Sequence, residues 1–347
     1  GAAPFSFSVA LPEGNYRVTV TLGDSAGASR TTVRAESRRL MLERVATAAG
    51  EFTTRTFPVN VRTPRIAGDA RVRLKARERG ALHWDEKLTL EFNDARPCVC
   101  ALEIAPADDA VTVFILGDST VTDQPSEPYR GWGQMLPRFF GPGVAVANHA
   151  ESGESLKSAR GAGRLDKVLS TMKPGDYLLI QFGHNDQKER GPGVGAFTTY
   201  AGDLKQFVAA ARGRGGIPVL VTSMQRRRFD AAGRVVNSLG DYPEAVRRVA
   251  REEGVPLIDL HALSTAFYEA LGPTESARAF VDGSHHTNYG AYELARCVVE
   301  GIKQDAPGLA QGLRDDGVPF DPHHPDPPEG FRIPASPRRP AAAPDGS

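Results

Sequence analysis

The apolar stretch from Val111 to Leu116 ends abruptly at Gly117-Asp118-Ser119, and it limits the fold of this chain more than any other feature. Five of its six side chains are β-branched or aromatic. A short apolar run of this kind is typical of a strand buried on both faces of a parallel sheet. The turn after it places a hydroxyl at the carboxyl end of the strand, where open α/β sheets bind their ligands. Ser119 is therefore a candidate nucleophile, provided that a base lies within hydrogen-bond reach.

Beyond residue 109 the chain alternates between strand and helix patterns. Further strands are predicted at Val144–Ala147, Tyr177–Phe182, Val219–Thr222 and Leu257–Leu260, and helices at Gly131–Phe140, Arg164–Met172, Tyr200–Gly213, Tyr242–Glu253 and Tyr289–Gln304. Strands and helices at this spacing predict a parallel sheet covered on both faces. Five strands are too few for an eight-stranded barrel, so we expect a flavodoxin-like order. The predicted fold class for residues 109–312 is a three-layer αβα domain with a five-stranded parallel sheet.

The two ends of the chain have different patterns. Residues 1–108 contain short runs of period-two alternation, which predict a smaller all-β sandwich domain; the runs are Phe5–Ala10, Asn15–Leu22, Arg30–Ala35, Arg38–Val45, Phe52–Val61, Leu88–Asn93 and Val99–Ile104. Residues 313–347 are rich in Pro and are expected to form a solvated tail, because they offer little apolar surface to offset the entropy of ordering. His323 and His324, between Asp321 and Asp326, can also be interpreted as a metal site, although the solvated tail is favoured.

Composition excludes several classes of partner. The chain of 347 residues has 42 basic and 42 acidic side chains, so no overall charge attracts nucleic acid or an anionic membrane. No apolar run reaches the ~18 residues that a membrane-spanning helix needs. Cys98, Cys100 and Cys297 are too few for a disulfide framework, and we expect three buried free thiols.

Four polar clusters follow predicted strands or precede the last helix, so all four can meet at one edge of the sheet. Acyl transfer needs a nucleophile, a base held by a third group, and hydrogen-bond donors for an oxyanion. Ser119 can be the nucleophile, His285 the base and Asp282 the group that orients it. The backbone N–H groups of Ser119 and Gly153 and the side-chain amide of Asn185 can bind the oxyanion. His286 is a rival base, but its spacing from Asp282 favours His285.

Each of these residues also has a purely structural interpretation, as a turn or a helix cap, and only the ordered set favours catalysis. The substrate side is less well defined. Arg226, Arg227 and Arg228 can pair with carboxylates of an acidic sugar chain, or can form an ordinary ion-paired loop. Trp132 is expected, with Tyr129, to line the crevice. Trp84, in the all-β part, is expected in the core rather than as a platform for sugar stacking.

The motifs GDST, N-x-A-x-x-G-x-S, GHND and D-x-x-H, in this order, resemble the four blocks of the SGNH (GDSL-type) hydrolases. Longer strings are similar to the rhamnogalacturonan acetylesterase branch: NHAESGESLKS at 148–158, GHNDQK at 183–188, RRRFD at 226–230, LGDYPEAVR at 239–247 and DGSHHTNYG at 282–290. The resemblance covers about residues 111–304. It implies the same catalytic roles for Ser119, Asp282 and His285, and the same oxyanion roles for Ser119, Gly153 and Asn185.

The resemblance also implies an activity. Members of that branch are metal-free serine esterases without a cofactor that remove O-acetyl groups from pectin, rhamnogalacturonan or a related acetylated polysaccharide or oligosaccharide. It implies a secreted or periplasmic bacterial protein, and the all-β domain resembles galactose-binding-like sandwiches. Two alternatives are a lipase or thioesterase of the same fold, and a catalytically silent carbohydrate-binding protein. The lack of a conspicuous apolar lid helix disfavours the first, and the complete catalytic set disfavours the second.

Overall fold

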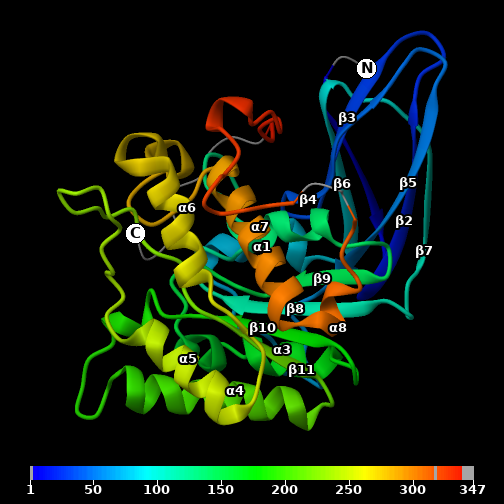
Figure 1. Cartoon of the computed structure of the whole chain (residues 1–347). Coiled ribbons are helices and arrows are strands. Elements are labelled where there is room, and N and C mark those ends of the chain that lie inside the picture. The colour runs from blue at the N-terminus through cyan, green and yellow to red at the C-terminus, as the bar shows by residue number, and fades with distance from the viewer. Residues whose placement is uncertain (1–2, 316–318, 338–347) are drawn as a thin grey trace.

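A parallel five-stranded sheet forms the centre of the C-terminal part of the chain, as the computed structural model of residues 3–315 and 319–337 shows (Figure 1). Its strand order is β12-β11-β10-β8-β9, which is the predicted flavodoxin-like order. The strands are β8 (Val111–Gly117), β9 (Val144–Asn148), β10 (Tyr177–Gln181), β11 (Ile217–Val221) and β12 (Leu257–Ile258). Strand β8 lies between the edge strand β9 and the central strand β10, at the point where the strand order reverses.

Helices cover both faces of this sheet, which confirms the predicted three layers. Helices α3, α4 and α5 lie on one face, and α1, α6 and α7 on the other (Figure 1). The helices are α1 (Trp132–Met135), α2 (Leu156–Gly161), α3 (Arg164–Thr171), α4 (Ala201–Gly213), α5 (Tyr242–Glu253), α6 (Leu260–Glu275), α7 (Asn288–Asp305) and α8 (Pro307–Ala310). Strand β8 directs Val113 and Ile115 to the α7 face and Phe114 and Leu116 to the α4 face. Burial on both sides explains why its sequence is apolar throughout.

Two antiparallel sheets form an all-β region at the N-terminal end, here called the β region (residues 5–106). One sheet has the order β1-β6-β3-β4 and the other β5-β2-β7. The strands are β1 (Phe5–Ala10), β2 (Gly14–Gly23), β3 (Ser29–Ala35), β4 (Arg39–Thr47), β5 (Phe52–Val61), β6 (Lys87–Arg96) and β7 (Val99–Pro106). Val18, Phe57 and Leu90 are among the side chains buried between the sheets, as expected of a sandwich. The domain boundary at 108/109 stays a prediction.

Some predicted elements differ from the observed ones. The helix predicted at 131–140 is a single turn, α1, followed by a 3₁₀ turn at Leu136–Phe139, because Pro137 cannot continue the α-helical bonding. The strand predicted to reach Leu260 ends at Ile258, because Asp259 caps helix α6 through the backbone N–H of Ala262. Helices α2, α6 and α8 have no counterpart among the predicted elements.

The expectation of a solvated tail is wrong for residues 319–337. Ile333 is buried, and the Phe331 ring packs against Tyr289 and Tyr292 of α7 at centroid distances of 5.9 and 5.7 Å. Asn93 donates to the Ala335 carbonyl at 2.9 Å, so the segment binds to the β region as well. A few apolar anchors and backbone hydrogen bonds to folded neighbours offset its ordering entropy. Residues 316–318 and 338–347 of the predicted tail lie outside the described residues.

Three smaller predictions concern side chains. Cys98 and Cys297 are buried free thiols, but Cys100 is exposed on β7, so that part of the prediction is wrong. Trp84 is buried, and the Arg62 guanidinium lies 4.5 Å from its ring centroid, which confirms the core interpretation. In the described parts of the chain, no cluster of three or more His, Cys, Asp or Glu side chains could hold a metal ion. Nor is any described helix long and apolar enough to cross a membrane.

Candidate active site

The turn after β8 presents Ser119 at the carboxyl edge of the sheet. Gly117 is required there, because a Cβ atom would lie 2.7 Å from a Val121 methyl group and 2.8 Å from the Gln181 carbonyl oxygen. The buried Asp118 carboxylate accepts hydrogen bonds from the backbone N–H and hydroxyl of Thr120, at 2.9 and 2.7 Å. It also lies 3.2 Å from Nδ1 of His184. These contacts fix the backbone on both sides of Ser119.

Ser119, His285 and Asp282 form a continuous hydrogen-bonded line. The Ser119 Oγ lies 2.9 Å from Nε2 of His285, and Nδ1 of His285 lies 2.8 Å from Oδ2 of Asp282. The other oxygen of Asp282 accepts the backbone N–H groups of Ser284 and His285, both at 2.7 Å. The segment that carries Asp282 and His285 leads directly into helix α7, whose first residue is Asn288. The structure thus brings together three residues separated by up to 166 positions in the sequence.

Electrostatics fixes the direction of these hydrogen bonds. Burial opposes ionisation of Asp282, but the hydrogen bonds from His285 and Ser284 outweigh it and lower the pKa of Asp282 to about 2. The carboxylate is therefore ionised at neutral pH and can only accept hydrogen bonds. In the neutral imidazole, Nδ1 of His285 then carries the proton that Asp282 accepts, and the lone pair of Nε2 faces the Ser119 hydroxyl. This is the arrangement that a general base requires.

The predicted oxyanion donors lie on segments that touch the same turn. The Gln124 side-chain amide donates to the Ser119 carbonyl at 2.7 Å and to the Ser152 hydroxyl at 3.3 Å, which brings the loop after β9 beside the nucleophile. The Asn185 amide donates to the Glu154 carbonyl at 3.0 Å. Among the described residues, the backbone N–H groups of Ser119 and Gly153 have no hydrogen-bond acceptor. Neither N–H is therefore committed to a described partner, as an oxyanion donor requires.

The structure separates His286 from the site. Its Nε2 lies 2.8 Å from the Tyr268 hydroxyl, and its side chain is buried between aromatic rings. Burial lowers the pKa of His286 to about 3, so the imidazole is neutral. Tyr129, by contrast, places its ring edge-on against His285, with the centroids 5.9 Å apart. Tyr129 is half-buried at this position, and its role in lining a crevice stays a prediction.

The residues predicted to contact substrate have different positions. Trp132 is fully buried and donates to the Gln181 side chain at 2.7 Å, so the prediction that it lines the crevice is wrong. Its indole fills the core beneath the nucleophile turn because Trp132 begins a helix packed on the sheet. Arg226 donates to the Ser284 hydroxyl at 3.1 Å, next to His285, and Arg227 donates to the Pro273 carbonyl at 2.7 Å. Arg228 is exposed.

Three supporting residues have roles that the motifs do not predict. Asp118 and His184 lie inside recognised motifs, but their mutual contact depends on how β8 and β10 pair. Gln124 lies outside the motifs, and the sequence gives no sign that its amide reaches both Ser119 and Ser152. The role of a buried polar residue that connects two loops can be recognised only when the positions of both loops are known.

Comparison with known proteins shows which family the chain belongs to. A model of the GDSL-like Lipase/Acylhydrolase family matches residues 115–294, a range that contains Ser119, Gly153, Asn185, Asp282 and His285. The chain belongs to this family. The fold class and the expectation of a carboxylic ester hydrolase are thereby confirmed.

Two relatives from Bacillus subtilis are similar to this chain over more than half of its length. Rhamnogalacturonan acetylesterase RhgT of Bacillus subtilis (strain 168) is 45% identical over 211 residues, which are 56% of this chain and 90% of the relative. The uncharacterized esterase YxiM of the same organism is 31% identical over 308 residues, which are 86% of this chain and 74% of the relative. The crystal structure of B. subtilis YxiM, 28% identical, covers 88% of this chain and 81% of its own length with a TM-score of 0.54. The similarity to YxiM extends over most of this GDSL-family chain, including much of the β region.

Proposed function

We propose that this protein is a serine esterase that removes O-acetyl groups from pectin, rhamnogalacturonan or a related acetylated glycan. The observation that carries the proposal is the line from Ser119 through His285 to the ionised Asp282 at the carboxyl edge of the sheet. The acetyl specificity is supported by similarity to RhgT and to the probable rhamnogalacturonan acetylesterase YesY of B. subtilis, which is 37% identical over 201 residues. A secreted or periplasmic location belongs to the same proposal, because the substrate is a cell-wall polymer.

The proposed mechanism has two acyl-transfer steps. His285 Nε2 takes the proton of the Ser119 hydroxyl as Oγ attacks the acetyl carbonyl carbon, and Asp282 stabilises the imidazolium that forms. The backbone N–H groups of Ser119 and Gly153 and the Asn185 amide bind the developing oxyanion. The imidazolium then gives its proton to the departing sugar oxygen, which leaves an acetyl-serine. Water attacks this ester with His285 again as base, and acetate is released.

The basic residues near the site support an acidic substrate. Arg228 is exposed, and Arg226 lies beside Ser284 with part of its side chain accessible. The exposed Arg228 guanidinium can pair with the carboxylate of a uronic acid, whereas the Arg226 guanidinium is already bonded to Ser284, Ser238 and the His184 carbonyl. Arg227 contributes less to this proposal, because its guanidinium is bonded to Pro273 and Ser276.

The test compares the wild-type protein with Ser119→Ala on p-nitrophenyl esters of increasing acyl length and on acetylated pectin. We expect acetyl turnover that falls with chain length, acetate release from the polymer, and loss of ~10³-fold or more in the variant, because the hydroxyl that His285 Nε2 contacts is removed. Preference for long chains would instead indicate a lipase or thioesterase. Activity that persists in Ser119→Ala would remove the proposed nucleophile, and an inactive wild-type protein that binds the polymer would favour the silent carbohydrate-binding alternative.

A further inference from the structure

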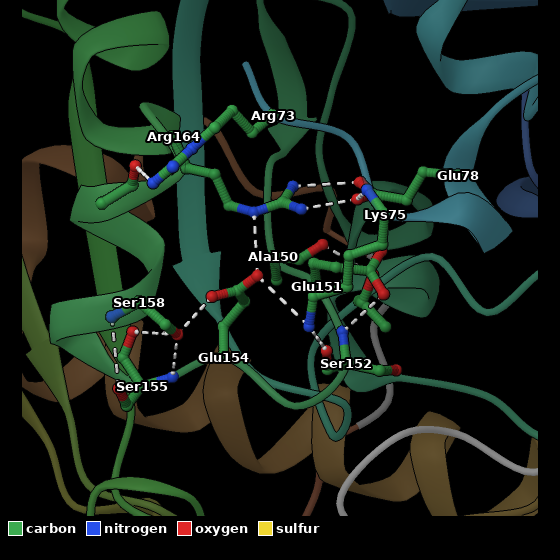
Figure 2. A network of polar contacts seen from close by, with 12 residues as sticks. Arg73, Lys75, Glu78, Ala150, Glu151, Ser152, Glu154, Ser155, Ser158 and Arg164 are labelled. Carbon is green, nitrogen blue, oxygen red and sulfur yellow. Dashed lines mark hydrogen bonds and ion pairs between the residues drawn. The ribbon is translucent and has the colours of Figure 1, made fainter.

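The segment between β5 and β6 (residues 62–86) belongs to the β region in sequence but lies on the α/β part of the molecule. The backbone N–H of Arg73 donates to the Ala162 carbonyl at 2.9 Å, and Val72 is buried. Trp84 packs its ring edge-on against His149, with the centroids 5.7 Å apart. The 3₁₀ turn Ala76–Glu78 then brings charged side chains to the loop after β9, which carries Gly153 (Figure 2).

Lys75 contacts both neighbours of Gly153. Its ammonium group donates to the Ser152 carbonyl oxygen and lies 3.3 Å from a carboxylate oxygen of Glu154. The Ser152 carbonyl and the Gly153 N–H belong to the same peptide unit. A cation bonded to the oxygen holds the plane of this peptide and polarises it, which makes the opposite N–H a stronger donor. Lys75 thus acts on the proposed oxyanion donor through one peptide group.

Arg77 reaches both sides of the proposed oxyanion hole. Its Nε lies 2.9 Å from Glu151, whose same carboxylate oxygen accepts the backbone N–H of Ser152 at 2.8 Å. Its Nη2 donates at 3.2 Å to Gln124, the residue whose amide donates to the Ser119 carbonyl. One guanidinium therefore supports the turn of the nucleophile and the loop of Gly153 together.

Glu78 completes the network from a buried position. It receives two hydrogen bonds from the Arg164 guanidinium, at 3.0 and 2.6 Å, and both side chains are at most 2% exposed. The Nε of Arg164 lies 3.5 Å from Glu154, as Figure 2 shows. Removing one member of such a buried pair leaves an uncompensated charge and endangers folding. Lys75 and Arg77, whose side chains are 30% and 23% exposed, are the better residues to vary.

We propose that Lys75 and Arg77 are positioning residues for ester hydrolysis, and that the β region acts on catalysis by holding the oxyanion donors of the α/β part. The proposal rests on the esterase function proposed above. It predicts a defect in the chemical step, because neither side chain contacts Ser119 Oγ, His285 or Asp282 in the described structure. Binding of a small acetyl ester should change little.

The experiment measures kcat and KM for p-nitrophenyl acetate in Lys75→Met, Arg77→Met and the control Arg73→Met. Arg73 lies on the same segment and also donates to a carbonyl of the α/β part, but this is the carbonyl of Gly161 at the end of α2, not one in the loop that carries Gly153. Losing one oxyanion donor costs ~10²–10³ in rate, so we expect displaced donors to lower kcat by roughly 10- to 100-fold, with KM changed less than about 2-fold. Arg73→Met should match the wild-type rate. Lys75→Arg, which keeps the cation, should restore most of the kcat lost in Lys75→Met.

Two results would overturn the proposal. One is a kcat in Lys75→Met and Arg77→Met equal to that of Arg73→Met, at unchanged melting temperature. The other is an equal loss of kcat in Lys75→Met and Lys75→Arg. It would indicate that the loop is loosened in general, and not that a cation at position 75 holds the peptide between Ser152 and Gly153. Failure of the esterase function itself looks different, because the wild-type protein would then be inactive or Ser119→Ala would remain active.

Discussion

At the scale of single residues, Asp282 links catalysis to stability. Its pKa is lowered to about 2 from an ordinary value of 3.8 by hydrogen bonds that outweigh burial. An acid whose pKa is lower in the folded state stabilises the fold above its unfolded pKa and loses this contribution as pH falls toward the folded pKa. The window for Asp282 is therefore about pH 4 down to pH 2. Its side chain is 31% exposed, so the contribution is at most about 2 kcal/mol.

The corresponding variant is Asp282→Asn. We expect kcat to fall by ~10³–10⁴, because the amide no longer holds Nδ1–H of His285 toward it and the tautomer is lost. We also expect the wild-type protein to be more stable than the variant at pH 6, with the difference shrinking between pH 4 and pH 2. Urea unfolding at several pH values, followed by circular dichroism, measures this. A difference that stays constant with pH would show that the carboxylate makes no ionisation-dependent contribution.

At the scale of elements, the loop from β9 to α2 depends on one glycine. Gly153 has φ +75°, in the left-handed region that side chains with a Cβ adopt at a cost of ~1–2 kcal/mol. Gly153→Ala should lower stability by about 1 kcal/mol and lower kcat by at least about 10-fold, because relaxation of the backbone turns the N–H donor. Gly50 has φ +78° in a turn of the β region, with open space around it. Gly50→Ala should show the same loss of stability with unchanged kcat. If both variants kept full activity, Gly153 would not be an oxyanion donor.

Helices and strands with a regular hydrophobic pattern could be predicted from the sequence. Elements whose bounds depend on whether one residue extends a strand or caps a helix could not. Helix α5 matches its predicted bounds because Val246 and Val249 repeat at helical spacing and Gly254 ends it in the left-handed region. Helix α6 was not predicted, since its start depends on whether Asp259 continues a strand or caps a helix. The site residues were predictable because Ser119, Gly153 and Asn185 follow strands of a parallel sheet, whose carboxyl ends share one edge, and Asp282 and His285 directly precede the last long helix. The burial of Trp132 was not predictable, since its neighbours come from other elements.

At the scale of the whole molecule, ion pairs join the β region to the α/β part. Arg39 pairs with Asp123 at 2.6 Å, and Glu78 with Arg164, with each of these side chains at most 2% exposed. Asp123 also accepts from the Asn148 amide at the end of β9, close to the site. The sequence does not predict such contacts. An Arg that pairs with a buried Asp of another part of the chain has the same local sequence pattern as an exposed Arg on a strand of a sandwich. The ion pairs indicate that the two parts form one unit in stability.

The ion pairs between the β region and the α/β part affect how the protein unfolds. Unfolding of the β region alone would break the Arg39–Asp123 and Glu78–Arg164 pairs and would expose to water the face of the α/β part that the β region covers. The loss of these shared contacts opposes separate unfolding, so we expect the two parts to unfold together.

The two tryptophans allow this to be measured, since Trp84 lies in the β region's connecting segment and Trp132 in the α/β part. In Trp84→Phe the fluorescence reports only Trp132, and in Trp132→Phe only Trp84. Within each variant, the urea midpoint from fluorescence should coincide with that from far-ultraviolet circular dichroism, which reports both parts. A biphasic circular dichroism curve, with each tryptophan following a different phase, would show that the parts unfold separately. The ion pairs across their interface would then be too weak to couple the β region to the active-site loops.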